Sequence, residues 1–363
     1  MKQGWEIIPF EDSIVKVKYT TKVPSNDYLD KGLYPIVSQE EGLVCGYWNN
    51  ANDLFKVSTP VVIFGDHTRI LKYIDFDFVL GADGVKILQP IENINAKFLK
   101  YYLQYCKIPS LGYSRHYKLL KELQVPVPPL PVQEQIVSEL DLLSSIIEKK
   151  RKQLKELDAL AQSIFYDMFG DPITNEKGWE VKKLGEVADI VGGSTPKTNI
   201  KEYWNGDNYW VTPAELHGTR YISSTERCIT DLAVDKAHLT QLPIGTVLLS
   251  SRAPIGKVCI TRVPMYCNQG FKNIICSNKL NSEYVYQYLI DKTEFLNSLG
   301  TGATFKEISK TTTENITIPI PPLPLQRQFA SKIEAIEKQK ELIKQSISET
   351  ETLFNARMQE HFG

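Results

Sequence analysis

Two stretches of the chain carry apolar residues at heptad spacing. In each stretch, two interleaved sets of residues recur every seven positions, as the a and d positions of a coiled coil do. The pattern predicts two long helices that pack against each other, the first about 57 Å long for residues 132–169 at ~1.5 Å per residue. The alternative is that each helix packs on its own domain. The apolar residues that carry the pattern are Ile136, Leu140, Leu143, Ile147, Leu154 and Leu157 in the first stretch, and Phe329, Ile333, Ile336, Ile343 and Ile347 in the second.

Polar residues interrupt and limit these two stretches. Lys150 and Lys340 occupy core positions in different heptads, where a polar residue costs stability but fixes the register of the two helices. Gly170, with a proline two residues later, predicts the end of the first helix. In the second stretch the apolar seam is regular up to Thr350 and frays beyond that residue, where Arg357 and His361 take core positions.

The two helical stretches belong to an internal repeat. The phrase PVPPLPVQEQ at residues 126–135 returns as PIPPLPLQRQ at residues 319–328, each time directly ahead of a heptad stretch. A second signature, GWE, stands at residues 4–6 and again at 178–180. One such phrase alone would suit a P-x-x-P ligand, but its repetition here favours a stiff elbow that leads the chain into each helix. Two copies of one unit can meet about a pseudo-twofold axis, which would set the helices antiparallel.

The repeat orders the chain as globular part, helix, globular part, helix. The globular parts alternate short β-rich runs with turns rich in Gly and Asn, and each has an aromatic helix, predicted near residues 98–105 and 283–289. We therefore expect an α+β fold, in which two mixed α/β domains are joined by two long helices that form an antiparallel coiled coil. The predicted segments are residues 1–124, 125–171, 172–317 and 318–363.

Composition places the chain among ordinary globular proteins. Hydrophobic residues make up 42% and charged residues 23% of the 363 residues, and no apolar window is long enough to cross a membrane. The six cysteines form no C-x-x-C pair and the N-terminus lacks a secretory apolar region, which favours a cytoplasmic protein with reduced thiols. The net charge of −1 argues mildly against a nucleic-acid partner, although a basic face can be balanced by an acidic one.

The sequence lacks the motifs of several enzyme classes. A phosphate-binding loop needs G-x-x-x-x-G-K-[ST], and the nearest stretch, APIGKV at residues 253–258, has neither the first glycine nor the final hydroxyl. The five histidines make no H-E-x-x-H pair, and the [DNS]-P-P-[YFW] tetrapeptide of adenine methyltransferases is not found. These observations favour a binding or scaffolding protein with no catalytic residue and no metal ligand of its own.

Basic and hydroxyl residues recur instead in predicted loops at matched places of the two copies. Arg and Lys grip phosphates, and small hydroxyl residues, Asn and Arg read base edges, so these loops hold the candidate DNA-binding residues. Taken one at a time, each loop also fits an ordinary solvated turn. The candidates are His67, Arg69, Arg115, His116 and Lys118 in the first copy, and Ser194, Thr195, Lys197, Arg252, Lys257, Thr304 and Lys306 in the second.

The doubled proline–glutamine phrase, each time leading into a long helix, resembles the specificity (S) subunit of type I restriction–modification systems. Residues 192–216 and 64–88 resemble two varieties of that family's target recognition domains, so the likeness covers essentially the whole chain. The resemblance implies that each domain reads one half of a split, asymmetric site on double-stranded DNA. It also implies that the two helices set the length of the unread gap.

The same resemblance implies partners. Two adenine methyltransferase subunits would dock on the helices, and two ATP-driven restriction/translocase subunits would join the larger assembly. S-adenosylmethionine, ATP and Mg²⁺ would belong to those subunits, so we expect no cofactor in this chain and no membrane partner. Two alternatives stay open: a scaffold that assembles partners without reading DNA, and a free-standing coiled-coil adaptor.

Overall fold

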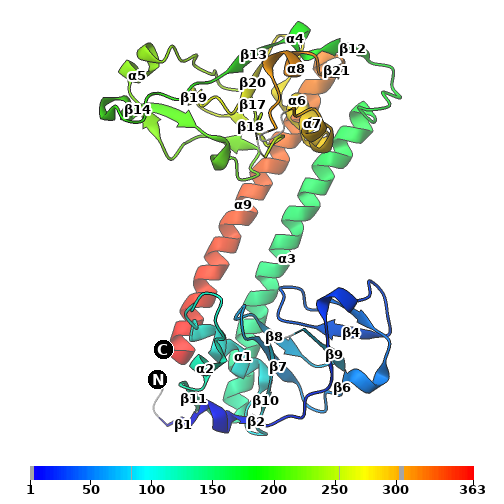
Figure 1. Ribbon diagram of the computed structural model, residues 1–363, viewed down its shortest axis with the longest axis vertical. Coiled ribbons are helices and arrows are strands. Elements are labelled where there is room, and N and C mark those ends of the chain that lie inside the picture. Colours follow the sequence, from blue (N-terminus) through cyan, green and yellow to red (C-terminus); the bar gives the residue numbers. More distant parts are fainter. Residues whose placement is uncertain (1–3, 83, 253, 302–305) are drawn as a thin grey trace. The chain divides into compact units, whose positions relative to one another are not determined.

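The computed structural model describes residues 4–82, 84–252, 254–301 and 306–363, and it divides into two compact units (Figure 1). Unit 1 comprises Met1–Lys152 and Lys344–Gly363, and unit 2 comprises Gln153–Ile343. The two long helices are α3 (Leu130–Phe169) and α9 (Leu323–Phe362). Each unit therefore combines one globular part with a segment of both long helices.

The globular part of unit 1 holds two sheets and a covering helix. One sheet has the strand order β2-β10-β7-β8, and its strand β7 is buried throughout; the other has the order β3-β9-β4-β5, with β6 also paired to β9. Helix α1 (Ala96–Tyr105) packs on the first sheet, and the short helix α2 (Tyr117–Leu120) follows it. The strands are β1 (Glu6–Pro9), β2 (Ile14–Val15), β3 (Lys22–Val23), β4 (Tyr34–Val37), β5 (Gly46–Trp48), β6 (Leu54–Phe55), β7 (Val61–Gly65), β8 (Leu71–Ile74), β9 (Phe78–Gly81), β10 (Val85–Pro90) and β11 (Gln124–Val127).

The globular part of unit 2 repeats this plan with insertions. Its main sheet has the order β13-β20-β17-β18-β15, which matches β2-β10-β7-β8 in the way successive strands pair, and a smaller sheet has the order β16-β14-β19. The helices are α4 (Leu184–Val187), α5 (Asp231–Lys236), α6 (Ser282–Asp291), α7 (Thr293–Ser298) and α8 (Lys310–Glu314). The strands are β12 (Glu180–Lys183), β13 (Ala188–Gly192), β14 (Trp204–Val211), β15 (Tyr221–Ile222), β16 (Cys228–Ile229), β17 (Val247–Leu249), β18 (Val258–Thr261), β19 (Tyr266–Cys267), β20 (Lys272–Cys276) and β21 (Thr317–Ile320).

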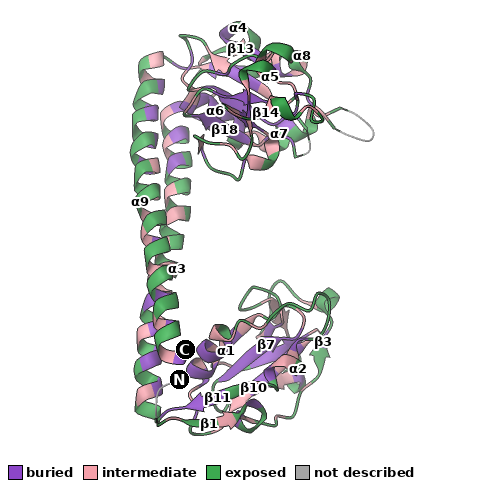
Figure 2. Ribbon diagram, turned by 90° about the vertical axis from the view of Figure 1, so that its left-hand side faces the viewer, coloured by how far each residue is buried: buried purple, intermediate pink, exposed green. Residues whose placement is uncertain are grey.

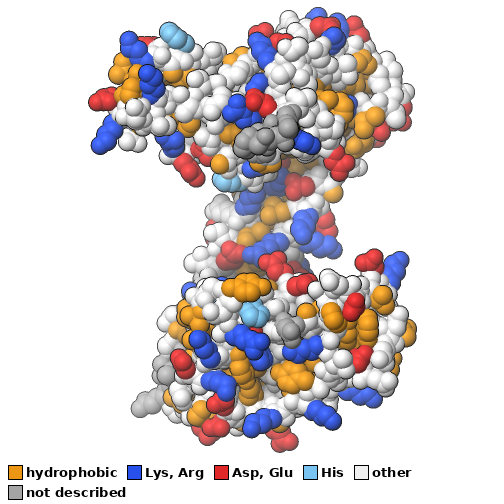
Figure 3. Space-filling view, viewed as in Figure 1, with side chains coloured by type: hydrophobic (Ala, Val, Ile, Leu, Met, Phe, Trp, Pro, Cys, Tyr) orange, Lys and Arg blue, Asp and Glu red, His pale blue; other side chains and the backbone are white. Residues whose placement is uncertain are grey.

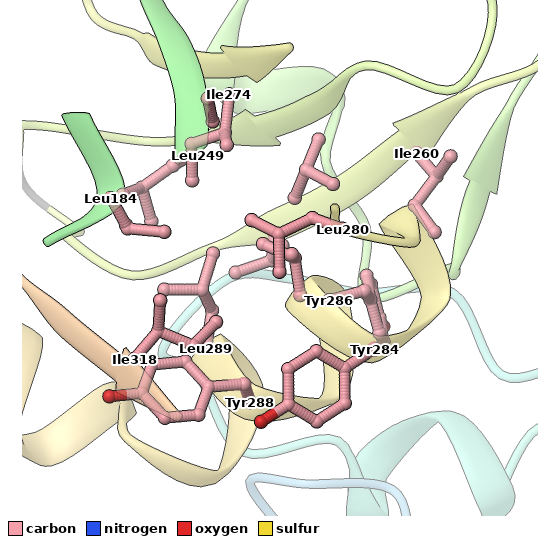
Figure 4. Close-up of a cluster of buried hydrophobic side chains, with 14 of the residues drawn as sticks. Leu184, Leu249, Ile260, Ile274, Leu280, Tyr284, Tyr286, Tyr288, Leu289 and Ile318 are labelled. Carbon is pink, nitrogen blue, oxygen red and sulfur yellow. The ribbon is translucent and has the colours of Figure 1, made fainter. Parts of the chain in front are cut away.

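The aromatic helices predicted from the sequence are core helices. In unit 2 the tyrosines of α6 belong to one buried cluster with apolar side chains of β17, β18 and β20, among them Leu249, Ile260 and Ile274 (Figure 4). Burial raises the pKa of Tyr286 to about 12, because its phenol has left water for this core. The expected α+β fold with two mixed α/β domains is confirmed.

A two-stranded ribbon closes each globular part at its elbow. In unit 1 the strand after the first GWE pairs antiparallel with β11, and in unit 2 β12 pairs with β21 in the same way. The repeated phrases noted in the sequence therefore meet in space as strand partners. The chain then enters α3 or α9 directly after two prolines, whose fixed backbone angles suit the start of a helix.

A buried glutamine in each copy fastens the long helix to its domain. Gln133 Nε2 donates to the carbonyls of Asn93 (2.8 Å) and Pro128 (2.7 Å), and its Oε1 accepts from the backbone N–H of Asn95 (2.8 Å). Gln326 makes the same three bonds in unit 2, with the carbonyls of Lys279 and Pro321 and the N–H of Asn281. Both side chains are fully buried, and Asn95 and Asn281 are the N-caps of α1 and α6. We call each set of three bonds a glutamine clamp.

The segments of α3 and α9 run antiparallel within each unit. In unit 1 Glu139 pairs with Arg357, while Arg151, further along α3, pairs with Glu351, which lies earlier on α9. The predicted apolar residues lie on the buried or half-buried sides of the helices, and Figure 2 shows exposed residues along their other sides. Gly170, with φ of +74°, follows the last residue of α3, as the sequence predicted.

The two lysines at core positions are satisfied by polar partners. Lys150 donates to Ser346 Oγ (2.6 Å) and Thr350 Oγ1 (3.0 Å) in unit 1. Lys340 pairs in unit 2 with Asp158 (2.7 Å) and with Glu337 of its own helix (2.8 Å). Because these partners exist at one register only, each lysine opposes sliding of the helices.

Helix α9 remains regular beyond Thr350, although the apolar heptad pattern becomes irregular there. The helix continues to Phe362, and Phe354, Met358 and Phe362 are buried. These three side chains pack on the globular part of unit 1 as well as on α3. The ring centroid of Phe362 lies 5.4 Å from that of Phe98 in α1. The end of α9 thus belongs to the core of unit 1, which the heptad pattern by itself could not reveal.

No helix in the described ranges is long and apolar enough to cross a membrane.

Candidate nucleic-acid interface

Two loops of unit 1 that carry predicted site residues are joined by His116. This side chain is fully buried; its Nδ1 lies 2.9 Å from the carbonyl oxygen of Asp66, and its Nε2 accepts from the N–H of Leu111 (2.9 Å). The pattern requires a neutral ring with the proton on Nδ1. Since both nitrogens are used inside the fold, the structure removes His116 from the candidate DNA contacts and makes it a positioning residue.

The joined loops present an aromatic and two cations to solvent. Tyr113 is 97% exposed, and its ring stacks on His67 with a centroid distance of 5.8 Å and an interplanar angle of 26°. Arg69 is exposed, adopts φ of +64°, and donates from Nη1 to the carbonyl of Ile108 (3.0 Å), so its backbone and guanidinium are both fixed. Arg115 is exposed beside them in sequence. Sequence reasoning missed Tyr113, because nothing in a single sequence separates an exposed aromatic from a core one.

The backbone of the first loop rests on Gln39. Its side chain accepts from the N–H of His67 (3.1 Å), and its carbonyl accepts from Thr68 Oγ1 (2.7 Å). Gly84, with φ of +92°, lies against the same side chain, where a Cβ would come within 2.7 Å of Gln39 Oε1. Lys118, in α2, is exposed just after the second of the two loops. The first loop is thus fixed by Gln39 on its inner side, while Thr68 and Arg69 are exposed to solvent.

In unit 2 the matching loops are joined by a carboxylate. Glu307 pairs with Arg252 (3.0 Å) and with Lys272 (3.1 Å). Burial alone would raise the pKa of Glu307, but the hydrogen bonds from Lys272 and Arg252 hold it below its ordinary value. Arg252 is still about half exposed, and Lys306 is exposed next to the carboxylate in sequence, whereas Thr304 lies outside the described residues.

The backbone link between these loops is the same in both units. The N–H of His116 donates to the carbonyl of Asp66 (2.8 Å), and the N–H of Ile308 donates to the carbonyl of Ser251 (2.9 Å). Lys257, another predicted site residue, is half-buried and donates to the carbonyl of Pro213 (3.3 Å). The two loops are therefore linked by the same kind of backbone bond in each unit, although the side chains they carry differ.

The glycine-rich loop of unit 2 lies on the segment that follows β19. Gly193 cannot carry a side chain there, because a Cβ would lie 2.1 Å from the carbonyl oxygen of Cys267. Ser194 is anchored through its backbone to that carbonyl, and Thr195 Oγ1 donates to Gln269 Oε1 (2.5 Å). Lys197 is exposed at the far side of the loop. The structure thus holds the hydroxyls of this loop and leaves its lysine facing solvent.

Charge on the visible face of unit 1 fits this arrangement. In Figure 3, Lys and Arg side chains lie around a histidine on that face. Among the described residues, no group of three or more His, Cys, Asp or Glu side chains could hold a metal ion. The two loop pairs offer cations, hydroxyls and an aromatic, which suit phosphate and base-edge contacts.

A family model covers most of the chain. The model described as "Type I restriction modification DNA specificity domain" matches residues 2–158 and 176–352, once for each copy of the repeat. The chain therefore belongs to this family of DNA specificity domains.

Curated relatives agree with that membership, and a solved structure shares the fold. The MjaIX specificity subunit of Methanocaldococcus jannaschii is 45% identical over 43% of this chain and 37% of its own length. The EcoR124I/EcoR124II specificity subunit of Escherichia coli is 28% identical over 76% of this chain and 72% of its own. The crystal structure of the S subunit from M. genitalium covers 99% of this chain and 96% of its own, at 13% identity and a TM-score of 0.64, which shows a shared fold.

Proposed function

We propose that this chain is the DNA-reading subunit of a type I restriction–modification complex and that it recognises a bipartite, asymmetric site. Each unit would read one half-site with its loop pair. The observation that carries the proposal is the repeated loop pair: the same backbone bond joins the loops in both units, while their exposed side chains differ. A shared frame with different side chains is what two different half-sites would require.

Different chemistry in the two loop pairs supports an asymmetric site. Unit 1 offers Arg69, Arg115 and the Tyr113–His67 stack. Unit 2 offers Arg252 braced by Glu307, with an exposed lysine beside it. An arginine can bond a guanine edge or a phosphate, and an exposed aromatic can contact bases by stacking. The two long helices would hold these heads at a fixed separation and so set the unread gap.

Catalysis would lie with the partner subunits. Two adenine methyltransferase subunits would dock on this chain, and two restriction/translocase subunits would complete the assembly. S-adenosylmethionine, ATP and Mg²⁺ would bind to those subunits. In this division of labour the chain contributes sequence selection and geometry, and the target adenine is taken out of the stack by its partners.

The direct test is the methylation pattern that the chain confers. The chain would be expressed with the methyltransferase subunit of its own system in a host without adenine methylation, and the genome sequenced by a single-molecule method that detects methyl-adenine. We expect one bipartite motif. Exchange of residues 4–123 for the matching domain of another family member should change one half of the motif and leave the other.

Two results would contradict the proposal. A stable complex with the methyltransferase but no methylated motif would favour a scaffold that does not read DNA. A change in both halves of the motif after exchange of one domain would show that the units do not read separately.

A further inference from the structure

Lys72 is a buried lysine at a core-facing position of unit 1. In strand β8 it shares a face with Ile74, which lies in the core between the two sheets, and only 5% of Lys72 is exposed. The equivalent position of unit 2 is that of Cys259, because each residue pairs with the strand position three residues before the carbonyl that links the loops of its unit. Cys259 is 1% exposed inside an apolar cluster. The sheet therefore accepts an apolar side chain here, and the lysine needs another explanation.

The Lys72 ammonium is surrounded by one loop. Residues 38–45, which we call the enclosing loop, join β4 to β5, and Nζ of Lys72 donates to the carbonyls of Ser38 (2.8 Å) and Gly42 (2.5 Å) in this loop. A third neighbour is Sγ of Cys45, at 3.7 Å. Burial of a lysine is costly unless polar partners satisfy its ammonium. Since these three partners belong to the enclosing loop, Lys72 holds that loop in shape.

Cys45 combines access from solvent with two polar neighbours at its sulfur. The side chain is half-buried, the hydroxyl of Ser38 donates to Sγ (3.1 Å), and the lysine nitrogen lies close by. A cation and a hydroxyl donor beside a partly exposed thiol are surroundings in which cysteines react with peroxide. Burial lowers the pKa of Lys72, and the nearby Cys45 opposes this effect. Oxidation of Cys45 to a neutral product removes that opposition, so Lys72 then loses its proton more readily.

The enclosing loop also supports the part of unit 1 that is proposed to read DNA. Gln39 belongs to this loop, and it accepts from the N–H of His67 (3.1 Å) and from Thr68 Oγ1 (2.7 Å). We call residues 66–70, which contain both donors, the reading loop. A change in the shape of the enclosing loop therefore reaches the reading loop through Gln39.

We propose that Cys45 and Lys72 form an oxidation-sensitive pair, in which peroxide oxidises the thiol and the lysine then closes a covalent S–N bond. The bond distorts the enclosing loop and withdraws its support from the reading loop, until a thiol reductant restores the pair. Unit 2, with Cys259 at the equivalent position, has no counterpart of this lysine. The covalent step depends on the contacts of the pair alone, whereas its effect on DNA reading rests on the proposed function.

Atoms and electrons balance over two steps. The Cys45 sulfur attacks one oxygen of hydrogen peroxide, the O–O bond breaks and water leaves, so the sulfur is oxidised by two electrons to a sulfenic acid. The Lys72 amine then attacks this sulfur, the S–O bond breaks, and the hydroxide leaves as water with a proton from the amine. The product has one new S–N bond and two hydrogen atoms fewer than the reduced chain. Two thiol molecules reverse it and become a disulfide.

The S–N bond removes hydrogen bonds that shape the enclosing loop. An ammonium carries three hydrogens, whereas the bonded nitrogen carries one. At most one of the carbonyls of Ser38 and Gly42 then keeps its bond to Lys72, and the other loses this donor. A covalent bond is also much shorter than the present 3.7 Å, so the enclosing loop must shift, and Gln39 shifts with it.

The first test looks for the bond itself. The full chain is treated with a small excess of hydrogen peroxide and digested with trypsin, which can cleave between the two residues at Lys56 and Arg69. We expect a cross-linked pair of peptides, joined from Cys45 to Lys72, that is two hydrogens lighter than the sum of the free peptides and is released by dithiothreitol. Cys228 is also half-exposed and serves as the internal control, since it should form no bond to a lysine.

Two variants separate the roles of the two residues. Lys72→Arg keeps a cation and hydrogen-bond donors but has no amine to attack the sulfur. The cross-link should therefore vanish, and Cys45 should instead gain oxygen atoms as a sulfinic acid. Cys45→Ser keeps a hydroxyl in place of the thiol and should stay unmodified at this position under the same treatment.

The second test measures DNA reading. The chain is oxidised alone, the peroxide is removed, and untreated methyltransferase subunit is then added, so the partner never meets the oxidant. Methyl transfer to DNA that carries the motif found by methylome sequencing should fall about fivefold or more for the oxidised parent, and dithiothreitol should restore it. The Cys45→Ser chain should methylate at the same rate before and after the treatment.

Each contrary outcome strikes a different step. If Cys45 stays unmodified, or is oxidised without a bond to Lys72, the proposal is overturned while the proposed function stands. If the bond forms and methyl transfer is unchanged, the enclosing loop does not control reading, and the proposal fails at that step. If the untreated parent confers no methylated motif, the proposed function fails, and with it the effect on reading, while the peptide masses still decide whether the S–N bond forms.

Discussion

The junctions between domain and long helix are built alike in the two units, but with different charges. In unit 1 Lys97 of α1 pairs with Asp141 of α3 at 2.6 Å, and both side chains are 36% exposed. In unit 2 the position of Lys97 is held by Glu283, which is 4% exposed and pairs with Arg220 at 3.1 Å. Arg220 Nε lies in turn 3.4 Å from Glu337 of α9. The same junction thus carries a half-exposed ion pair in one unit and a buried ionic network in the other.

The glutamine clamp is the part of the junction that does not differ. Gln133 and Gln326 bind backbone groups, whose positions are set by the fold and do not change when side chains change. Each ion pair joins two side chains, so one residue can be replaced if its partner changes as well. The comparison teaches that the two copies keep the same residue where a side chain hydrogen-bonds buried backbone groups. They differ where two side chains bind only each other.

Loss of Arg220 should have the largest effect on stability of the changes that separate the two junctions. Burial raises the pKa of Glu283, and the charge of Arg220 opposes that effect, so Arg220→Ala leaves a buried carboxylate without its main partner. We expect a loss of about 3–5 kcal/mol in the stability of unit 2. Hydrogen exchange of the amides of α6, followed by mass spectrometry, should accelerate accordingly.

The matched variant in unit 1 is Lys97→Ala. Because that pair is more than a third exposed, its loss should cost less than about 1 kcal/mol and leave exchange in α1 nearly unchanged. Equal effects of the two variants would show that burial of the ionic network does not distinguish the junctions.

Removal of a glutamine clamp should have nearly the same effect in both units. Gln133→Leu and Gln326→Leu keep side-chain bulk but leave two carbonyls and one N–H without a partner, which should cost about 2–4 kcal/mol in each case. Urea unfolding of each variant measures the loss. A large loss in one unit and none in the other would contradict the equivalence of the two clamps.

A further expected effect, smaller than that of the glutamine clamps, concerns pH and Asp291, at the end of α6. Burial raises its pKa to about 6, and its Oδ2 has no hydrogen-bond partner. Since the ordinary value is 3.8, the folded protein holds a proton more readily than the unfolded chain. The stabilisation this gives is fully present below pH 3.8 and is lost as pH rises through about 6.

Asp291→Asn imitates the protonated carboxyl. The variant should be more stable than the parent by about 1–2 kcal/mol at pH 8, because a carboxyl pKa raised from 3.8 to about 6 corresponds to at most about 3 kcal/mol before solvent screening. Below pH 3.8, where the carboxyl is protonated in both the folded and the unfolded parent, the two proteins should unfold at nearly the same urea concentration. A variant that is equally destabilised at both pH values would show that the charge of Asp291 is not the cause.

The sequence predicted the parts of the fold that depend on periodicity and repetition. The heptad pattern and the doubled phrase located both long helices, and the chain enters and leaves α3 within two residues of the expected places. Periodicity did not predict burial at the end of α9, because that part of the helix packs on α1 as well as on α3. Phe362 contacts α1, which is far away in sequence, so its burial has no local signal. For the same reason the chain divides within the helices, at Lys152 and Ile343, and not at the elbows.

The candidate site was harder to predict residue by residue. Loop sequence identified the regions, but exposure within a loop depends on contacts that come from elsewhere in the chain. His116 and Arg115 are neighbours of similar polarity, yet one is fully buried and the other is exposed. The carbonyl of Asp66, fifty residues away, and the N–H of Leu111 hold the ring of His116 inside the fold.

The glutamine clamp has a consequence for how new specificities can arise. Each clamp asks little of the domain it holds: a backbone N–H at the N-cap of one helix and a carbonyl two residues before it, as at Asn95 and Asn93 or at Asn281 and Lys279. Any domain that places those two backbone groups in the same positions could be held by the same glutamine, whatever the sequence of its loops. Recombination between genes could therefore exchange a whole globular domain in one step, because the glutamine clamp bonds backbone groups and does not depend on the side chains of the domain.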